Sequence, residues 1–347
     1  MHLFEHDEFD DHEQVVFCRD VEAELRAIIA IHSTRLGPAA GGCRMWPYDS
    51  EADALTDVLR LSAAMSYKNA LAGLPLGGGK SVIIADASSE HKPALLTAFA
   101  QHVQRLAGTY YTAEDIGVGP EDIRVMAAAS EYVFGLPDGT GDPSPFTARG
   151  VFEGLRAAVG ARLGRDDLAG VRVAVQGVGH VGYHLCRLLH EHGAELIAAD
   201  PDPDSLARVR AEFGATVVEL DEIYGQDADV FAPCAVGGVV NDATIPQLRV
   251  SVVAGAANNQ LARPEHGQQL HDRGIMYAPD YVINAGGMLS ASGDIWGEYD
   301  RDETLAKVTK LFDTTRAICS ASLAEGRPAS AVADGMAREI VAAGSTG

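Results

Sequence analysis

The sequence has little of what marks secreted, membrane-embedded or disulfide-stabilised proteins. Its five cysteines are scattered and form no CxxC pair, which indicates neither a disulfide framework nor a thiolate zinc site. The acidic amino terminus, MHLFEHDEFDDHE, lacks the basic start and apolar core of a signal peptide. No apolar run approaches the roughly 20 residues that span a bilayer. We therefore expect a reduced, soluble, cytoplasmic protein.

Positive charge is also scarce. Lys and Arg number 27 against 49 Asp and Glu, so the formal net charge is −22. A surface this acidic repels phosphate backbones and anionic lipid, so we expect neither nucleic acid nor membranes as partners. Hydrophobic residues make up 47% of the 347 residues and charged residues 22%. These values are typical of an ordinary globular protein, and the length suggests two domains.

The order of expected elements indicates the fold class. Residues 51–68 have helical spacing with Ser50 as a cap, and a glycine-rich turn at 77–79 leads into a strand at 81–85. A turn is also expected at 37–42, and Gly, Pro, Asp and Ser crowd together at 135–145, the expected domain boundary. Beyond it, strands and helices alternate, as in a doubly wound parallel sheet with helices on both faces. We expect two α/β domains, 1–138 and 139–321, with a terminal helix of about 322–347 packing back on the first and an active site in the cleft between them.

A GxGxxG motif in the second domain predicts a dinucleotide site. It comprises Gly177, Val178, Gly179, His180, Val181 and Gly182, between a strand at 171–175 and a helix that starts near 180. Gly177 would allow the tight turn, Gly179 the approach of a pyrophosphate, and Gly182 close helix packing. Asp200, at the end of the next strand, would bind the ribose hydroxyls and repel a 2′-phosphate, which favours NAD over NADP. The alternative is a tight turn in an unrelated α/β protein.

Two other motifs are weaker. His180 and His184 have a spacing that can bind zinc, but no accompanying glutamate is present, so a turn residue and a packed histidine are favoured and no metal is predicted. Gly79, Lys80 and Ser81 suggest a phosphate loop. The required earlier glycine is displaced, however, and the segment leads into a strand, which argues against an NTPase.

Two lysines stand out in this acidic chain because no carboxylate lies near either in the sequence. Lys68 is at a helix end and Lys80 at the start of a strand. If both are partly buried, like charge and desolvation would lower the pKa of each. The alternative is two solvated surface lysines. Asp115 follows a strand and is either a proton carrier or a helix cap.

Long blocks of the chain resemble a known family. They include GPAAGGCRMWPY, DVLRLSAAMSYKNALAGLPLGGGKSVII, AEDIG, GDPSPFTARGV, VAVQGVGHVGYHLC, AGAANNQL and YAPDYVINAGG. The sequence resembles the glutamate, leucine, phenylalanine and valine dehydrogenases over essentially its whole length, and most closely the leucine and phenylalanine branch. The resemblance implies reversible oxidative deamination of an L-amino acid with NAD, a first domain for substrate binding and oligomerisation, a Rossmann-type NAD domain, and a homo-oligomer.

The resemblance also implies residue roles. Lys68 would hold the substrate α-carboxylate with Asn259, Lys80 would be the catalytic lysine, and Asp115 would shuttle protons. Thr147 would orient the nicotinamide amide. The remaining implied substrate residues are Ala40, Gly41, Met65, Ala113, Met288 and Ala291, and the remaining cofactor residues are Cys234, Ala235, Ala256, Asn258 and Asn284.

The expected substrate is an apolar amino acid. Glutamate members carry a lysine at the position of Ala40, whereas leucine members carry leucine there and valine at the positions of Met288 and Ala291. We expect activity on leucine, valine and isoleucine with measurable phenylalanine activity. The alternatives are an aromatic specificity, or a non-catalytic NAD sensor that keeps the fold.

Overall fold

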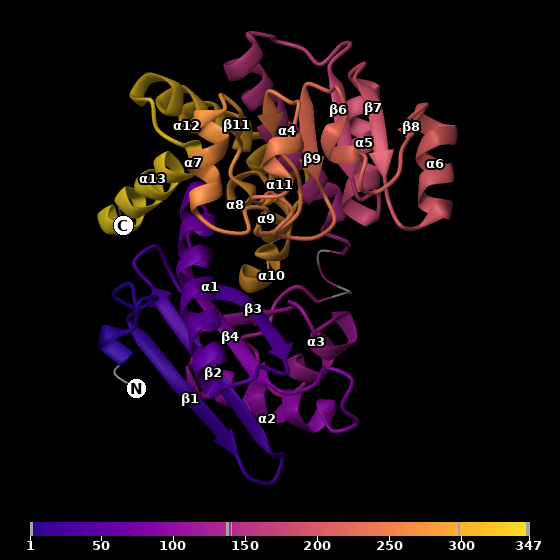
Figure 1. The fold of residues 1–347 in the computed structure, drawn as a ribbon. Coiled ribbons are helices and arrows are strands. Elements are labelled where there is room, and N and C mark those ends of the chain that lie inside the picture. The colour runs from indigo at the N-terminus through magenta and orange to yellow at the C-terminus, as the bar shows by residue number, and fades with distance from the viewer. Residues whose placement is uncertain (1–2, 137–138, 140, 298, 345–347) are drawn as a thin grey trace. The chain divides into compact units, whose positions relative to one another are not determined.

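The computed structural model describes residues 3–136, 139, 141–297 and 299–344 (Figure 1). The chain divides into two compact units. Unit 1 comprises residues 1–142, 290–300 and 337–347, and unit 2 comprises residues 143–289 and 301–336. The expected boundary after residue 138 falls outside the described residues, and the observed division follows Asp142. The terminal segment that joins unit 1 begins at residue 337, later than the expected 322, and residues 290–300 join it as well.

Unit 1 contains a mixed five-stranded sheet in the order β1-β2-β4-β3-β5. β2 pairs antiparallel with β1 and β4, whereas β3 pairs parallel with β4 and β5. Ser50 caps α1 by accepting the N–H of Asp53, as expected. The elements are β1 (Gln14–Asp20), β2 (Leu25–Ser33), β3 (Ala39–Trp46), α1 (Glu51–Leu71), β4 (Gly77–Ile84), α2 (Lys92–Arg105), β5 (Tyr110–Ala113), α3 (Pro120–Ala127) and α10 (Gly293–Trp296).

The two turns expected in unit 1 are strands. Residues 39–42 begin β3, and Gly77, Gly78 and Gly79 begin β4. These positions require glycine because a side chain would collide with neighbouring elements. A Cβ on Gly78 would lie 2.1 Å from the backbone N of Ser66 in α1, and one on Gly79 would lie 2.7 Å from the Tyr110 ring. Apolar residues of α1 cover one face of the sheet, and those of α2 and α3 cover the other.

Unit 2 contains a parallel six-stranded sheet in the order β11-β10-β9-β6-β7-β8, which confirms the expected doubly wound fold. The strand order reverses between β6 and β9. The elements are α4 (Ser144–Leu163), β6 (Arg172–Gln176), α5 (His180–Glu191), β7 (Glu195–Ala199), α6 (Pro203–Phe213), β8 (Thr216–Val217), β9 (Val230–Pro233), β10 (Val252–Val253), α7 (Glu265–Asp272), β11 (Met276–Tyr277), α8 (Asp280–Ile283), α11 (Arg301–Thr309) and α12 (Leu311–Glu325).

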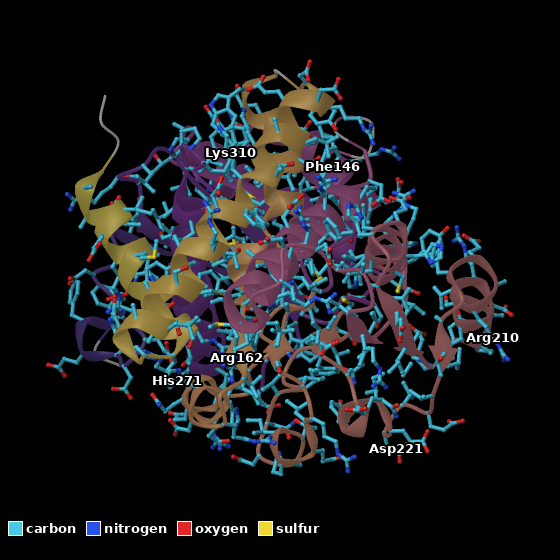
Figure 2. The ribbon with its side chains drawn as sticks, turned by 90° about the horizontal axis from the view of Figure 1, so that it is seen from above. Phe146, Arg162, Arg210, Asp221, His271 and Lys310 are labelled. Carbon is cyan, nitrogen blue, oxygen red and sulfur yellow. The ribbon has the colours of Figure 1, made fainter. Side chains whose placement is uncertain are left out.

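Two helices cross the division between the units, α9 (Gly286–Ala291) and α13 (Ala329–Ala343). Within unit 2, Arg162 at the end of α4 lies near His271 of α7 (Figure 2), and its Nε donates to the carbonyl of Gly274 at 2.7 Å. No helix in the described part of the chain is long and apolar enough to cross a membrane.

Candidate active site

The structure brings the two expected catalytic residues of unit 1 into contact. Lys80 lies in β4 and is 7% exposed, and its Nζ forms an ion pair with Oδ2 of Asp115. The solvated alternative for Lys80 is therefore wrong. Asp115 follows β5 and does not cap a helix, because α3 begins at Pro120 with Gly119 as its N-cap. A buried lysine paired with a carboxylate is typical of sites that move protons.

Strand β3, which lies between β4 and β5, makes this contact possible. Gly42 of β3 pairs with Ala113 at the end of β5, two residues before Asp115. A Cβ on Gly42 would lie 2.2 Å from the carbonyl of Glu114 and 3.0 Å from Cβ of Asp115. Any side chain at this position would push Asp115 away from the sheet, so Gly42 is required for the Lys80–Asp115 pair.

Asp115 is surrounded by groups that favour its charged form. Oδ1 accepts the N–H of Ile116 at 2.7 Å, and Oδ2 lies 3.6 Å from the guanidinium of Arg44 as well as against Lys80. Burial raises the pKa of Asp115, but the charges of Lys80 and Arg44 outweigh it and hold the pKa below its ordinary value. Asp115 is thus an anion at neutral pH.

Helix α1 contributes the expected carboxylate-binding lysine. Lys68 and Met65 are three residues apart on α1 and both are half-buried. A side chain on Gly41 would lie 3.0 Å from Cγ of Met65, so α1 packs directly over this part of β3. Lys68 belongs to unit 1, whereas its expected companion Asn259 belongs to unit 2, so their joint role stays a prediction.

Three small residues of unit 1, Ala113, Gly135 and Ala291, lie close together. A Cβ on Gly135 would lie 3.9 Å from Cβ of Ala113 and 4.0 Å from Cβ of Ala291. Ala113 and Ala291 are expected substrate residues, and Gly135, which the sequence indicated only as part of a boundary, lies between them. Ala40 is fully buried in β3. Met288 is half-buried and lies on the unit 2 side of the division.

The glycine motif of unit 2 has the geometry expected of a dinucleotide loop. Gly177 has φ +92°, in the left-handed region, and α5 begins at His180 with Gly179 as N-cap. A Cβ on Gly182 would lie 2.0 Å from the Gly177 carbonyl, so the helix packs closely on the loop. Among the described residues, none outside the adjoining chain lies within 4 Å of the Cβ position of Gly179. The amino end of α5 is therefore accessible to an anion.

Asp200 follows β7 and is tied to the glycine loop. Its Oδ2 accepts the N–H of Val178 at 2.7 Å, and its Oδ1 accepts the N–H of Asp202 at 2.8 Å. The nearest arginine in the following helix is engaged elsewhere: Arg208 stacks on the Tyr183 ring at 3.6 Å and donates to Glu212 at 3.1 Å. Arg208 is thus held by Tyr183 and Glu212 and does not pair with Asp200.

The other expected cofactor residues of unit 2 meet at the carboxyl ends of the strands. Cys234 follows β9 and donates its N–H to the Gln176 carbonyl of β6 at 2.7 Å, and a Cβ on Gly177 would lie 2.6 Å from Cβ of Ala235. β6 and β9 are the strands between which the order reverses, the usual place for ligands in such sheets. Val181 lies in the first turn of α5.

Asn284 forms hydrogen bonds with two further expected cofactor residues, Asn258 and Ala256. Its Nδ2 donates to Oδ1 of Asn258 at 2.8 Å and to the Ala256 carbonyl at 3.2 Å, while its buried Oδ1 has no hydrogen-bond partner among the described residues. Asn259 has φ +52°, a strained conformation for a residue with a side chain. Thr147, in the first turn of α4, donates to the Pro143 carbonyl at 3.2 Å and lies beside Gly287.

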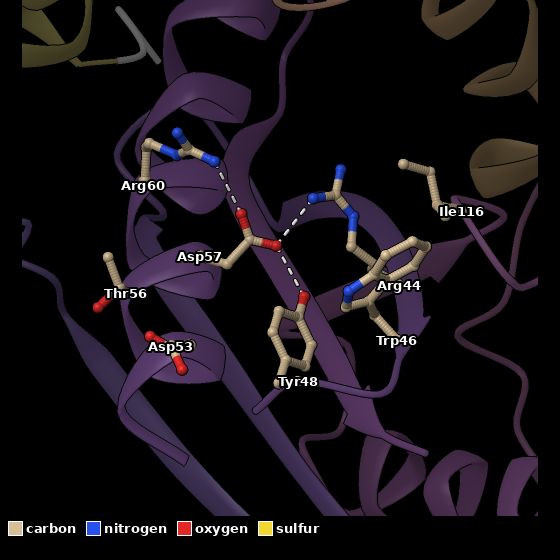
Figure 3. Close-up of a pocket in the computed structure, with 8 residues that line it drawn as sticks. All are labelled: Arg44, Trp46, Tyr48, Asp53, Thr56, Asp57, Arg60 and Ile116. Atoms are coloured by element: carbon tan, nitrogen blue, oxygen red, sulfur yellow. Dashed lines mark hydrogen bonds and ion pairs between the residues drawn. The ribbon is translucent and has the colours of Figure 1, made fainter. Parts of the chain in front are cut away.

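Sequence reasoning missed three residues beside the catalytic pair. Arg44 bonds Asp57 of α1, and Asp57 also accepts the hydroxyl of Tyr48 (Figure 3). The only sequence signal was an arginine two positions after Gly42. Among the described residues, no group of three His, Cys, Asp or Glu side chains is arranged to hold a metal ion.

A dinucleotide-type sheet, joined in one chain to a unit with a buried lysine–aspartate pair, is typical of a nicotinamide-dependent oxidoreductase. Comparison with known families agrees. The model of the Glu/Leu/Phe/Val dehydrogenase dimerisation domain matches residues 12–132, and that of the Glutamate/Leucine/Phenylalanine/Valine dehydrogenase domain matches residues 139–202 and 202–310. The chain belongs to the Glu/Leu/Phe/Val dehydrogenase family. It is an NAD(P)-dependent amino-acid dehydrogenase, and the dimerisation domain indicates a homo-oligomer.

Individual relatives differ in substrate. Leucine dehydrogenase of Geobacillus stearothermophilus is 49% identical over 344 residues, which cover 98% of this chain and 94% of the relative. Phenylalanine dehydrogenase of Bacillus thermotolerans is 47% identical, covering 90% and 83%. The crystal structure of L-tryptophan dehydrogenase from Nostoc punctiforme has a TM-score of 0.87 at 45% identity and covers 96% of each chain. The family and the type of reaction are thus shown, and the preferred amino acid is left open.

Proposed function

We propose that this protein catalyses the reversible, NAD-dependent oxidative deamination of branched-chain and other apolar L-amino acids. The observation that carries the proposal is the buried contact between Lys80 and Asp115. The overall reaction converts the amino acid, NAD and water into the 2-oxo acid, NADH, ammonium and a proton. NAD, when bound, accepts the hydride from the substrate α-carbon.

Lys80 and Asp115 would divide the proton transfers. A lysine activates water only as the free amine, and Asp115, which touches Lys80, is placed to relay the lysine proton onward to solvent. Lys80 then removes a proton from the water that adds to the imine carbon, and Asp115 passes protons between the nitrogen and solvent. When the carbon–nitrogen bond breaks, ammonia leaves as ammonium and the 2-oxo acid remains. Lys68 would anchor the substrate α-carboxylate as a fixed cation.

The residues of unit 1 fit an apolar side chain. Ala113, Gly135 and Ala291 form a small, uncharged wall, and Ala40 offers no charge for a glutamate carboxylate. An apolar pocket distinguishes one methylene by only about 1–3 kcal/mol, so a broad specificity follows. The same small wall is the observation that favours the second candidate, an aromatic amino acid, because it leaves room for a ring.

The residues of unit 2 fit NAD. The open amino end of α5 suits the pyrophosphate, and the buried, unpartnered Oδ1 of Asn284 is a free acceptor for an amide donor such as the nicotinamide carboxamide. Asp200 would accept the ribose hydroxyls and repel a 2′-phosphate, and Arg208 is held away from that role by Tyr183 and Glu212. Thr147 would orient the nicotinamide.

An initial-rate screen tests the proposal. Purified protein is assayed at 340 nm and alkaline pH with NAD or NADP and a panel of L-amino acids, beside Lys80→Ala. We expect leucine, valine and isoleucine to be the best substrates, phenylalanine to be measurable and glutamate to be inert. Binding of NAD without turnover of any L-amino acid would instead support the sensor. The cytoplasmic location and the exclusion of nucleic acid and membranes as partners stay predictions.

A further inference from the structure

Arg44 connects the catalytic carboxylate to a second buried carboxylate. It lies in β3, and its side chain is 15% exposed. One guanidinium nitrogen, Nη1, donates to Oδ2 of Asp57 at 2.8 Å (Figure 3). The other, Nη2, lies 3.6 Å from Oδ2 of Asp115. The planar fork of an arginine can serve two carboxylates at once, which a lysine ammonium on a flexible stem does less well.

The far end of this connection is firmly held. Asp57 lies in α1, and its carboxylate also accepts the Tyr48 hydroxyl at 2.7 Å and the Arg60 guanidinium at 2.9 Å. Burial raises the pKa of Asp57, but the Tyr48 hydrogen bond and the two arginines outweigh burial and hold this pKa below its ordinary value. Asp57 is therefore an anion. Arg44 is therefore oriented by a charged partner and not by packing alone.

We propose that Arg44 is a positioning residue: it holds the Asp115 carboxylate in place and charged, through its anchor on Asp57, while Lys80 serves the substrate. This inference rests on the proposed role of Asp115 as proton carrier. In the structure Lys80 and Arg44 approach the same oxygen, Oδ2, of Asp115. When Lys80 turns to the reacting carbon, Arg44 is the cation that remains beside that oxygen.

The charges around Asp115 make this cation necessary. From β4 comes Lys80, from β3 come Arg44 and the neutral Cys43 thiol, from β5 the neutral Tyr110, and Glu114 adjoins Asp115 in the chain. Asp57 stands on the other side of Arg44. Of the two cations beside Asp115, only Lys80 would remain without Arg44, and Asp115 would take up a proton more readily and lose its fixed orientation.

The test uses the full-length protein with a matched control. Arg44→Met removes the charge and keeps an unbranched side chain, and Arg44→Lys keeps the charge without the fork. Arg60→Met removes an exposed arginine that touches only Asp57 of the two carboxylates. Three quantities are measured: kcat and KM for L-leucine, the Kd for NAD, and the carbon-13 titration of the Asp115 carboxyl, assigned by its disappearance in Asp115→Asn.

We expect Arg44→Met to lower kcat about tenfold or more, to leave the NAD Kd unchanged, and to move the Asp115 titration to higher pH. Arg44→Lys should restore the titration and only part of kcat. Arg60→Met should change both far less than Arg44→Met, because Tyr48 and Arg44 still hold Asp57. A titration that does not move in Arg44→Met, or that moves equally in Arg60→Met, overturns the inference. If Arg44→Met does not fold, Arg44→Lys is the deciding variant. A kcat equal to that of the wild type in Arg44→Lys would show that the guanidinium is not needed and would overturn the inference.

A last pattern separates this inference from the proposed function. If the titration moves in Arg44→Met while kcat is unchanged, and Asp115→Asn is also active, Asp115 is not the proton carrier and the proposed function fails in that role. If Asp115→Asn is inactive and kcat of Arg44→Met is unchanged, only the positioning role of Arg44 is overturned.

Discussion

Asp294 holds Gly135 in place across more than 150 residues of sequence. One oxygen of Asp294, Oδ2, accepts the backbone N–H of Gly135 at 2.9 Å and that of Leu136 at 2.9 Å. Asp294 lies in α10, three residues after Ala291, and the carboxylate thereby fixes Gly135 between Ala113 and Ala291. The shape of the proposed side-chain pocket depends on this contact between distant segments.

Gly135→Ala should change both stability and specificity. Gly135 has φ +76°, so a Cβ costs about 1–2 kcal/mol of folding stability. The new methyl also enters the space beside Ala113 and Ala291, so kcat/KM for phenylalanine should fall about tenfold relative to leucine. The control is Gly73→Ala, with φ +68° and no protein atom within 4 Å of its Cβ position, which carries the strain alone. An equal ratio of the two substrates in both variants would remove Gly135 from the pocket.

Ala40→Leu is a second, independent change to the pocket. We expect it to cut phenylalanine turnover more than leucine turnover by filling the space that a ring would occupy. Because Ala40 is fully buried, the leucine can also overpack unit 1, at a cost of about 1–3 kcal/mol. Thermal unfolding measured beside the kinetics separates the two effects. A larger loss with leucine than with phenylalanine would show that Ala40 does not line the distal pocket.

Turnover should depend on the charged side chains of both Lys80 and Asp115. Lys80→Ala and Asp115→Asn should each abolish turnover and leave the Kd for NAD near the wild-type value, because both residues lie outside the glycine-loop unit. Steady-state kinetics and NAD titration measure the two properties. A variant that keeps more than about a tenth of kcat has lost less than about 1.4 kcal/mol of transition-state stabilisation, which contradicts the assigned role.

Asp200 should determine the choice of cofactor. The native enzyme should have a much higher kcat/KM with NAD than with NADP, because Asp200 and a 2′-phosphate repel each other. Asp200→Ser should narrow the difference because it removes the charge that repels the 2′-phosphate, although it also removes the carboxylate that accepts the N–H of Val178. The comparison is made at one fixed amino-acid concentration with both cofactors. Equal use of NAD and NADP by the native enzyme would refute the assignment.

His12 should make stability depend on pH. Its Nε2 lies 2.9 Å from Oγ of Ser62 and 3.1 Å from the Leu59 carbonyl, and burial, with the neighbouring His32, lowers the pKa of His12 to about 4. Between pH 6.5 and 4 the unfolded chain binds the proton more readily, so up to about 3 kcal/mol of stability present above pH 6.5 is lost as pH falls.

Urea unfolding of His12→Gln across this range should show a shallower pH dependence than the wild type. His91→Gln is the control, because His91 is exposed before α2. An unchanged slope in His12→Gln would assign the pH dependence to other groups.

Local patterns in the sequence were enough to predict the glycine loop of unit 2 and the strands and helix around it. The glycine motif, the helix that follows it and Asp200 one strand later depend on short-range geometry, the turn at Gly177 and the period of strand and helix, which neighbouring residues determine. For Lys80 the sequence left two interpretations open, a partly buried lysine and a solvated one, because apolar and glycine neighbours were the only signal.

Tertiary structure alone decided the rest. Gly77, Gly78 and Gly79 lie in a strand and not a turn because α1 and Tyr110 pack where their side chains would be, and sequence does not show which element approaches a glycine. The Lys80–Asp115 pair, the Arg44 connection to Asp57, and the meeting of Ala113, Gly135 and Ala291 all join strands and helices that are distant in the chain. Such contacts depend on how the sheet orders its strands and which segments return to it, and no local period encodes either.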